Sequence, residues 1–281
     1  MKMIFNKIYI DDLIKRALYE DINYIDLATD YLTSDDSVST AEYIAKADGV
    51  LCGIDIAMRV FQLLDDDIET EIFIHDGEKL KKGDIIGRVH GKTKTILEGE
   101  RTSLNILQHC SGISTATAEY AAQCEGTNAS IAETRKTLPG LRALEKYAVT
   151  IGGGKNHRFN LSDAAMIKDN HADAYGGITN AVNVLRSKMG HMNKIEVEVR
   201  NKEELNEALA VGVDVIMLDN MSPAEMAECV RITAGRARLE ASGGITLETI
   251  REVAQTGVDI ISIGALTHSV KAFDISLKIK K

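Results

Sequence analysis

A set of mostly basic side chains is concentrated in the middle of the sequence, and several members directly follow short apolar segments. The set consists of Thr134, Arg135, Lys136, His157, Arg158 and Lys168. Arginine recognises planar anions such as carboxylates through paired hydrogen bonds, whereas lysine supplies a compact positive charge. If these side chains meet in the fold, they form a binding site for a substrate with several carboxylate or phosphate groups.

Two carboxylates follow the same pattern farther along the chain. Glu198 lies at the end of the segment KIEVEV, and Asp219 directly follows VIML. Because isolated carboxylates would repel an anionic substrate, we expect them to hold Mg²⁺ or to bind ribose hydroxyls. Mg²⁺ typically uses one or two protein carboxylates together with phosphate oxygens of the substrate. Glu198 and Asp219 are therefore the predicted magnesium ligands.

Glycine-containing turns complete the pattern. They comprise Ser242, Gly243 and Gly244 after the segment RLEA, and Gly264 and Ala265 after IISI. Such turns let backbone N–H groups approach a phosphate, especially where a helix begins just after them. The run Gly152–Gly154 is not a P-loop, because Lys155 is followed by Asn156 and no glycine stands at position 149. The combined residues indicate a site for a polyanion, a phosphate and magnesium.

These residues are positioned by a strand-then-helix alternation in the second half of the chain. The predicted strands are Ala129–Glu133, Ala165–Ile167, Lys194–Val199, Val213–Leu218, Arg238–Ala241 and Ile260–Ile263. Helical patterns such as Lys202–Ala210 separate them, and the segment GVDVIML recurs as GVDIISI. Repeated strand–helix units favour a parallel sheet or barrel, in which the carboxyl ends of all strands open onto one face. We therefore expect the polar residues to meet at that face.

Each of these residues also has an ordinary interpretation. A lone basic residue at a strand end is commonly solvated or salt-bridged, and Glu198 or Asp219 could pair with Lys194 or an arginine. Gly152–Gly154 could be a flexible turn. The joint occurrence of suitable groups at successive strand ends, rather than any one residue, favours the functional interpretation.

The first part of the chain has a different pattern. Residues 7–20 have helical apolar spacing, and residues 39–46 and 69–75 alternate as strands do. From Leu97 to Cys124 the pattern is helical again, and we place a domain boundary near residue 108 within it.

The composition narrows the class of protein. The chain has 281 residues, 44% of them hydrophobic, no tryptophan and a formal net charge of −9, which disfavours binding to nucleic acid or anionic membranes. The four cysteines are scattered without a C-x-x-C pair, so we expect reduced thiols rather than a zinc site. No signal-like or membrane-spanning apolar run is present, and we expect a cytoplasmic protein.

Several motifs in unbroken order resemble those of one family. They are Glu133–Arg142, Glu145–Val149, Gly152–Arg158, Ile167–His171, Glu196–Val199, Ile216–Asn220, Leu239–Ile245 and Ser262–Ser269. From about residue 10 to its end, the sequence is similar to quinolinate phosphoribosyltransferases, also called carboxylating nicotinate-nucleotide pyrophosphorylases. The resemblance implies transfer of a phosphoribosyl group from 5-phosphoribosyl 1-pyrophosphate to quinolinate, giving nicotinate mononucleotide, pyrophosphate and CO₂ for NAD biosynthesis.

The resemblance also implies the fold. It predicts an α/β protein with an N-terminal α/β sandwich domain (residues 1–108) and an incomplete, seven-stranded α/β barrel (residues 109–270). The tail, residues 271–281, is expected to pack back on the N-terminal domain. It further implies a homodimer in which Arg101 of one subunit reaches into the other subunit's site. Assembly of such dimers into hexamers is left open.

Roles for individual residues follow from the same resemblance. Arg135, His157, Arg158 and Lys168 would bind the quinolinate carboxylates and a neighbouring phosphate, with Lys136 near the reacting centre. Thr134 is also expected to bind the substrate. Glu198 and Asp219 would contact ribose hydroxyls and Mg²⁺. The 5-phosphate would be held by the turns Ser242, Gly243 and Gly244, and Gly264, Ala265 and Leu266. The resemblance implies no organic cofactor.

Three alternatives remain open at this point. A molybdenum-utilisation paralogue shares the fold and several motifs but acts on another substrate. A Schiff-base aldolase could use Lys168 at a strand end, although the lysine would need desolvation to become nucleophilic. A metabolite-binding regulatory protein would bind the same ligands without releasing pyrophosphate.

Overall fold

The chain divides into two units, and a long helix, α4 (Thr93–Gln123), passes from the first to the second. The computed structural model describes residues 6–280. The first unit contains the chain up to Ala116 and again from Val270 onward, and the second contains Thr117–Ser269. The predicted boundary near residue 108 also falls within α4. Among the helices of residues 6–280, none has an apolar stretch long enough to cross a bilayer.

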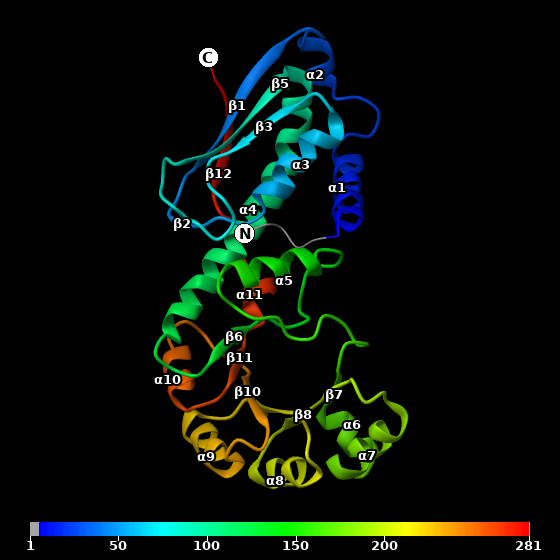
Figure 1. Ribbon diagram of the computed structural model, residues 1–281, viewed down its shortest axis with the longest axis vertical. Helices are drawn as coiled ribbons and strands as arrows, with labels where there is room; N and C mark the ends of the chain where they lie inside the picture. The colour runs from blue at the N-terminus through cyan, green and yellow to red at the C-terminus, as the bar shows by residue number, and fades with distance from the viewer. Residues whose placement is uncertain (1–5, 281) are drawn as a thin grey trace. The chain divides into compact units, whose positions relative to one another are not determined.

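The first unit is built on an antiparallel sheet covered by helices (Figure 1). The sheet order is β12 (Ile275–Ile279), β1 (Val38–Ala45), β5 (Ile85–Lys92) and β3 (Glu69–Ile72), and β2 (Gly49–Val50) pairs separately with β4 (Lys79–Leu80). The helices are α1 (Lys7–Asp21), α2 (Leu27–Leu32), α3 (Ile54–Leu64) and the first part of α4. The last strand of the chain therefore lies beside β1, with Tyr43 opposite Leu277.

The core of this unit forms between the sheet and helix α3. Tyr43 of β1, Ile86 of β5 and Phe61 of α3 are completely buried in one apolar cluster. Helix α3 begins where the Asp76 carboxylate accepts the N–H groups of Gly53 and Ile54, at 2.8 and 3.1 Å. A carboxylate at this place satisfies backbone donors that have no partner within the helix.

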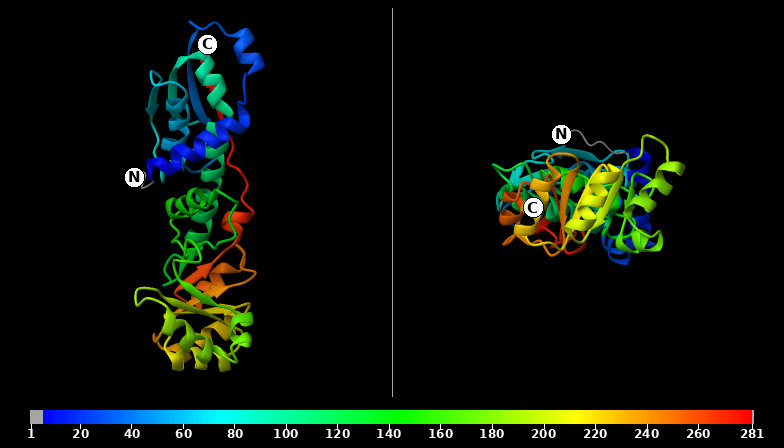
Figure 2. Two further views of the ribbon diagram at one scale, coloured as in Figure 1. Left: turned by 90° about the vertical axis from the view of Figure 1, so that its right-hand side faces the viewer. Right: turned by 90° about the horizontal axis from the view of Figure 1, so that it is seen from below.

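The second unit is a parallel sheet with helices on its outer side. The sheet order is β6 (Ser130–Ala132), β11 (Ile260–Ser262), β10 (Arg238–Ser242), β9 (Val215–Asp219), β8 (Ile195–Val199) and β7 (Ala165–Ile167). The helices are α5 (Arg142–Ile151), α6 (Asp169–Ala174), α7 (Ile178–Lys188), α8 (Lys202–Val211), α9 (Pro223–Thr233), α10 (Ile250–Gln255) and α11 (Ala265–His268). Helices α7, α8 and α9 lie side by side along the sheet (Figures 1 and 2). The predicted α/β fold class is confirmed.

The predicted count of seven barrel strands needs a correction. Within the described residues the sheet has six strands, and the expected seventh is reduced to a single parallel bridge between Lys155 and Ala132. The Lys155 N–H donates to the carbonyl of Ile131 at 2.7 Å, but the pairing then stops. Beyond it, the backbone bonds to a side chain instead of to a strand: the His157 N–H donates to the Glu133 carboxylate at 3.1 Å. The barrel therefore stays open between this segment and β7.

Helices begin directly after strands because capping residues stand at those places. Asn201 follows β8, and its side chain accepts the N–H of Glu204 at 2.9 Å at the start of α8. Ser222 precedes α9 and forms a capping box with Glu225, with Pro223 in the first helical position. These residue types satisfy the free N–H groups of a helix start. The capping residues therefore determine how soon after each strand the next helix begins.

A buried ion pair lies beneath the segment that carries His157. Lys146 of α5 and Glu133 after β6 are both almost completely buried and form a direct ion pair. The Lys146 ammonium also donates to the His157 carbonyl at 2.9 Å. Burial raises the pKa of the Glu133 carboxyl, against the opposing effect of Lys146. Each buried charge is thus stabilised by the other and by a hydrogen bond to the backbone of His157.

We predict that replacing Lys146 with methionine lowers the free energy of unfolding by about 3–5 kcal/mol, since Glu133 would be left buried without its partner. The double variant Lys146→Met, Glu133→Gln should recover part of that loss. Urea denaturation followed by circular dichroism measures both effects. Lys202→Met, at an exposed pair with Glu228, is the matched control and should shift the midpoint little. Equal midpoints for all three variants would contradict the assigned role.

Candidate active site

A pocket of about 340 Å³ lies at the carboxyl ends of the parallel strands, where β/α barrels place their active sites. Nine of the residues singled out from the sequence line it: Thr134, Arg135, Lys136, His157, Arg158, Lys168, Glu198, Asp219 and Ser242. The strand register explains the meeting of the last three, since Glu198 lies opposite Met217 and Ser242 lies opposite Asp219. All lining residues belong to the second unit.

The remaining predicted residues have other positions. Gly243 and Gly244 directly follow Ser242 with φ of +103° and +63°, a conformation that glycine adopts most readily. Gly264 precedes α11, which begins at Ala265, and Leu266 is buried. Arg101 is exposed on α4 in the first unit and is not among the residues that line the pocket.

Two arginines give one side of the pocket its positive charge. The Nε of Arg135 is buried and has no hydrogen-bond partner among the described residues. Arg158 donates to the carbonyl of Ala164 at 2.8 Å, and within residues 6–280 no carboxylate forms an ion pair with it. Burial and the neighbouring Arg135 lower the pKa of Arg158. Two guanidinium groups without a paired carboxylate in the described part of the chain therefore line the same cavity. This arrangement suits a multiply charged anion.

The opposite side of the pocket combines a cation with two carboxylates. The Lys168 ammonium lies 3.1 Å from the Glu198 carboxylate and is about half exposed. Asp219 accepts a hydrogen bond of 2.8 Å from the side-chain amide of Asn220. These bonds orient both carboxylates at the ends of adjacent strands. The pair can bind hydroxyl groups or a hard cation together with oxygens of a ligand.

Lys136 is placed next to the Gly264 turn. The Thr267 hydroxyl donates to the Lys136 carbonyl at 2.8 Å, and the Lys136 N–H donates to the Thr134 hydroxyl at 3.1 Å. A Cβ atom added at Gly264 would lie 3.1 Å from Cδ of Lys136. The absence of a side chain at Gly264 thus leaves room for the lysine to cross the turn.

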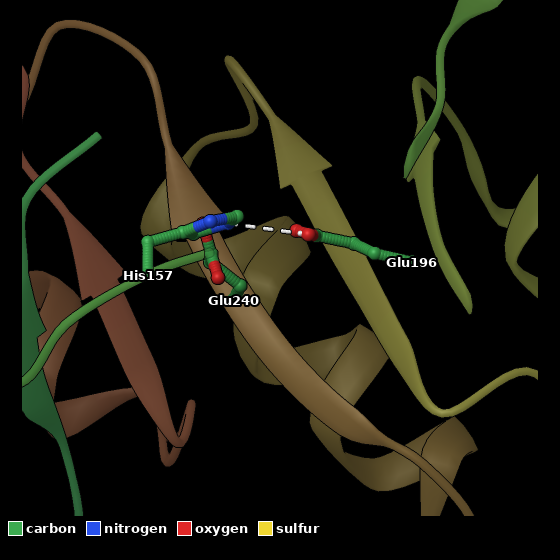
Figure 3. Close-up of side chains that lie close together, drawn as sticks. All are labelled: His157, Glu196 and Glu240. Carbon is green, nitrogen blue, oxygen red and sulfur yellow. Dashed lines mark ion pairs between the residues drawn. The ribbon is translucent and has the colours of Figure 1, made fainter. Parts of the chain in front are cut away.

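His157, which lines the pocket, lies between two buried carboxylates. Its Nε2 is 3.2 Å from Glu196 of β8 and 3.4 Å from Glu240 of β10 (Figure 3). Glu240 also accepts the hydroxyl of Ser262 at 2.5 Å. Burial alone would lower the pKa of His157, but the hydrogen bonds and charges of Glu196 and Glu240 raise it to about 10. Burial raises the pKa of Glu196.

The ring of His157 is oriented by both of its nitrogens. Nδ1 faces the N–H of Arg158 at 2.7 Å, which favours an unprotonated Nδ1, whereas the two carboxylates favour a second proton on the ring. Nε2 carries a proton in either charge state. The ligand atoms of His157, Glu196 and Glu240 lie within 4.8 Å of one another. Because the Nε2 proton lies between the two carboxylates, the three side chains form one buried hydrogen-bonded cluster.

Four residues of this region carry no sequence pattern used above: Met166, Met217, Glu196 and Glu240. A signal for the glutamates was available. Side chains two positions apart in a strand share a face, so Glu196 must point the same way as Glu198, and Glu240 the same way as Ser242. The glutamates form the next layer down, inside the barrel.

Comparisons with known proteins agree with this architecture. The family models described as the N-terminal and C-terminal domains of quinolinate phosphoribosyl transferase match residues 26–111 and 113–278. The probable nicotinate-nucleotide pyrophosphorylase (carboxylating) of Bacillus subtilis is 44% identical over 274 residues, which cover 98% of this chain and 94% of that protein. Quinolinate phosphoribosyltransferase (decarboxylating) 1b of Nicotiana tabacum is 44% identical over 95% of this chain and 81% of its own length.

A solved structure is also closely similar. The crystal structure of NadC from Streptococcus pyogenes superposes with a TM-score of 0.96 at 40% sequence identity, and the match covers 99% of each chain. The resemblance seen in the sequence motifs is thereby confirmed. With matching models for both domains and relatives similar over nearly the whole chain, this protein belongs to the quinolinate phosphoribosyltransferase family.

Proposed function

We propose that this protein transfers a 5-phosphoribosyl group from 5-phosphoribosyl 1-pyrophosphate to quinolinate and decarboxylates the product to nicotinate mononucleotide, for NAD biosynthesis. The observation that carries the proposal is one pocket that is lined both by the cations Arg135, Arg158 and Lys168 and by Glu198 and Asp219 at adjacent strand ends. The pocket belongs to a chain of the family described above.

The basic side of the pocket suits quinolinate, which has two adjacent carboxylates on a flat ring. The buried Nε of Arg135 supplies a donor without a partner, and Arg158 supplies a second guanidinium. Guanidinium groups bind carboxylates through paired hydrogen bonds. His157, held from below by Glu196 and Glu240, completes the cationic lining. A dianion bound here would satisfy the charges that the protein leaves unmatched.

The carboxylate side suits the ribose and its magnesium ion. The hydrogen bonds described above use one oxygen of Glu198 and one of Asp219, so the donor set fits a cation shared with substrate oxygens. Mg²⁺ bound here would offset negative charge on the pyrophosphate leaving group. We assign the 5-phosphate to the turns at Gly243–Gly244 and Gly264, whose glycines allow close approach of the backbone.

The chemistry follows from this arrangement. Loss of pyrophosphate leaves positive charge on the ribose ring, which Glu198 and Asp219 can stabilise from fixed positions. The ring nitrogen of quinolinate then bonds to the anomeric carbon, with Lys136 beside the reacting centre. When the adjacent carboxylate leaves as CO₂, its electron pair stays on the ring carbon, where the neighbouring pyridinium charge stabilises it until a proton from water replaces the carboxylate. The substrate itself supplies the stabilising charge, so we propose that no organic cofactor takes part.

We further propose a homodimer in which Arg101 enters the partner's site. Arg101 is exposed on α4, as this role requires. The first unit also exposes a run of apolar side chains between α1 and the end of α2, namely Tyr19, Tyr24, Leu27, Tyr31 and Leu32. Exposed apolar surface of this kind commonly marks an interface. Light scattering would separate dimers from hexamers.

We also propose that the protein is located in the cytoplasm. Its four cysteines form no disulfide, which agrees with a reducing compartment.

Purified protein should consume quinolinate only when magnesium and 5-phosphoribosyl 1-pyrophosphate are both present, and it should release pyrophosphate and CO₂ in equal amounts. Quinolinate absorbance, a coupled pyrophosphate assay and trapping of the released CO₂ measure this stoichiometry. Binding of quinolinate without release of pyrophosphate would instead support a regulatory protein. Complete inactivity toward quinolinate would favour the molybdenum-utilisation paralogue.

Replacing Lys136 with alanine should lower kcat by about a hundredfold or more, since it removes a preorganised charge at the reacting centre. The thermal unfolding midpoint should change little, because the side chain lies in the pocket rather than in the core. Steady-state kinetics and calorimetry check the two parts separately. Lys188→Ala, at an exposed position of α7, is the matched control. Wild-type turnover of the Lys136 variant would remove the lysine from the mechanism.

Mixing Arg101→Ala subunits with Lys168→Ala subunits should restore activity, because a heterodimer contains one site with both residues intact. Random exchange of equal amounts should give about one quarter of the wild-type activity, since half of the dimers carry one functional site each. Each variant alone should be nearly inactive. A mixture that stays inactive after proven subunit exchange would refute the shared site.

A further inference from the structure

Asn220, the residue directly after Asp219, has a backbone conformation that is uncommon for a residue with a side chain. Its φ is +53°, and within residues 6–280 Ala234 is the one other non-glycine residue with positive φ. Asparagine tolerates this left-handed conformation because its short polar side chain can hydrogen-bond to groups nearby. Such a conformation at the edge of a pocket calls for a structural reason.

Two hydrogen bonds fix Asn220 to two different strand ends. Its N–H donates to the carbonyl of Ser242 at 2.9 Å, which ties its backbone to the end of β10. Its side-chain Nδ2 donates to Oδ2 of Asp219 at 2.8 Å, at the end of β9. Asp219 is partly exposed in the pocket, so this donor fixes the direction of a carboxylate that could otherwise rotate.

The carboxamide of Asn220 also lies against the glycine turn. A Cβ atom added at Gly243 would overlap the side-chain oxygen of Asn220 and come within 3.1 Å of its backbone nitrogen. Gly243 therefore meets two requirements: it accommodates a φ of +103°, and it leaves space for this side chain. The same amide thus contacts the carboxylate of Asp219 on one side and the turn after Ser242 on the other.

We propose that Asn220 is a positioning residue that fixes Asp219 and the Gly243 turn relative to each other for the phosphoribosyl substrate. The inference rests on the proposed function, which assigns the ribose and magnesium to Asp219 and the 5-phosphate to this turn. Glycine would adopt this backbone conformation with less strain, so the contribution of asparagine lies in its side chain. Asn220 acts on the phosphoribosyl end of the site and leaves the quinolinate end unaffected.

The variant Asn220→Gly separates the side chain from the backbone conformation, because it keeps the positive φ and removes the carboxamide. We expect kcat/KM for 5-phosphoribosyl 1-pyrophosphate to fall by about ten- to a hundredfold, the usual effect of losing a group that orients a ligand. Calorimetric titration with pyrophosphate in the presence of Mg²⁺ should show a similar loss of affinity. Affinity for quinolinate and the unfolding midpoint should stay at wild-type values.

Two further variants serve as matched comparisons. Asn220→Asp keeps the size and the backbone preference but replaces the donor with a second carboxylate beside Asp219, so its loss should equal or exceed that of Asn220→Gly. Ala234→Gly makes the same backbone change at the end of α9, at the other non-glycine residue with positive φ, and should leave both kinetics and binding unchanged.

The outcomes separate this inference from the proposed function. A wild-type protein that does not turn over quinolinate refutes the function, and the orientation of Asp219 in a crystal structure of Asn220→Gly still tests the role of Asn220. An unchanged Asp219 carboxylate together with wild-type affinity for magnesium and pyrophosphate would overturn the inference. Equal losses for quinolinate and for pyrophosphate would also overturn it, because they would mean general disruption of the pocket.

Discussion

The buried ion pair between Glu133 and Lys146 is the interaction on which the site depends most. Neither charge has an alternative partner in water, since both side chains are almost completely buried. Through the Lys146 bond to the carbonyl of His157 and the Glu133 bond to its N–H, the pair fixes the backbone at the place where a seventh strand would run. In a regular strand these backbone groups would form hydrogen bonds with a neighbouring strand. Here they form hydrogen bonds with the side chains of Lys146 and Glu133, and the side chains of His157 and Arg158 line the pocket.

The pocket is built as layers of alternating charge. The upper layer contains the cations that face the solvent side, and the layer below contains the glutamates Glu196 and Glu240. Barrel interiors are usually filled by branched apolar side chains. Carboxylates in that layer let several cations stand close together, because each buried negative charge offsets part of the repulsion above it. A protein with a formal net charge of −9 can thereby present a locally positive cavity to an anion.

Much of this organisation could be predicted from the sequence, because strand ends and glycine turns are local patterns. Repetition of strand and helix indicated the parallel sheet, and polar residues such as Lys168 and Asp219 marked the ends of its strands. Other features depend on partners distant in sequence. Nothing around Glu240 shows that it meets His157, and nothing around Lys155 shows that pairing stops after one bridge. The left-handed backbone of Asn220 is equally hidden, since it results from the closeness of Ser242 and Gly243.

The pairing of β12 with β1 has a consequence for biosynthesis. These strands come from opposite ends of the chain, with Ala41 opposite Ile279. During translation, this edge of β1 has no partner until residues 275–279 have been synthesised. An unpaired edge is prone to join the wrong strand, and domains generally fold in the order of their synthesis. Here the last step departs from that order, because the sheet that contains β1 is completed only after the barrel strands have been synthesised. Deletion of β12 would therefore leave the edge of β1, far away in sequence, without its partner strand.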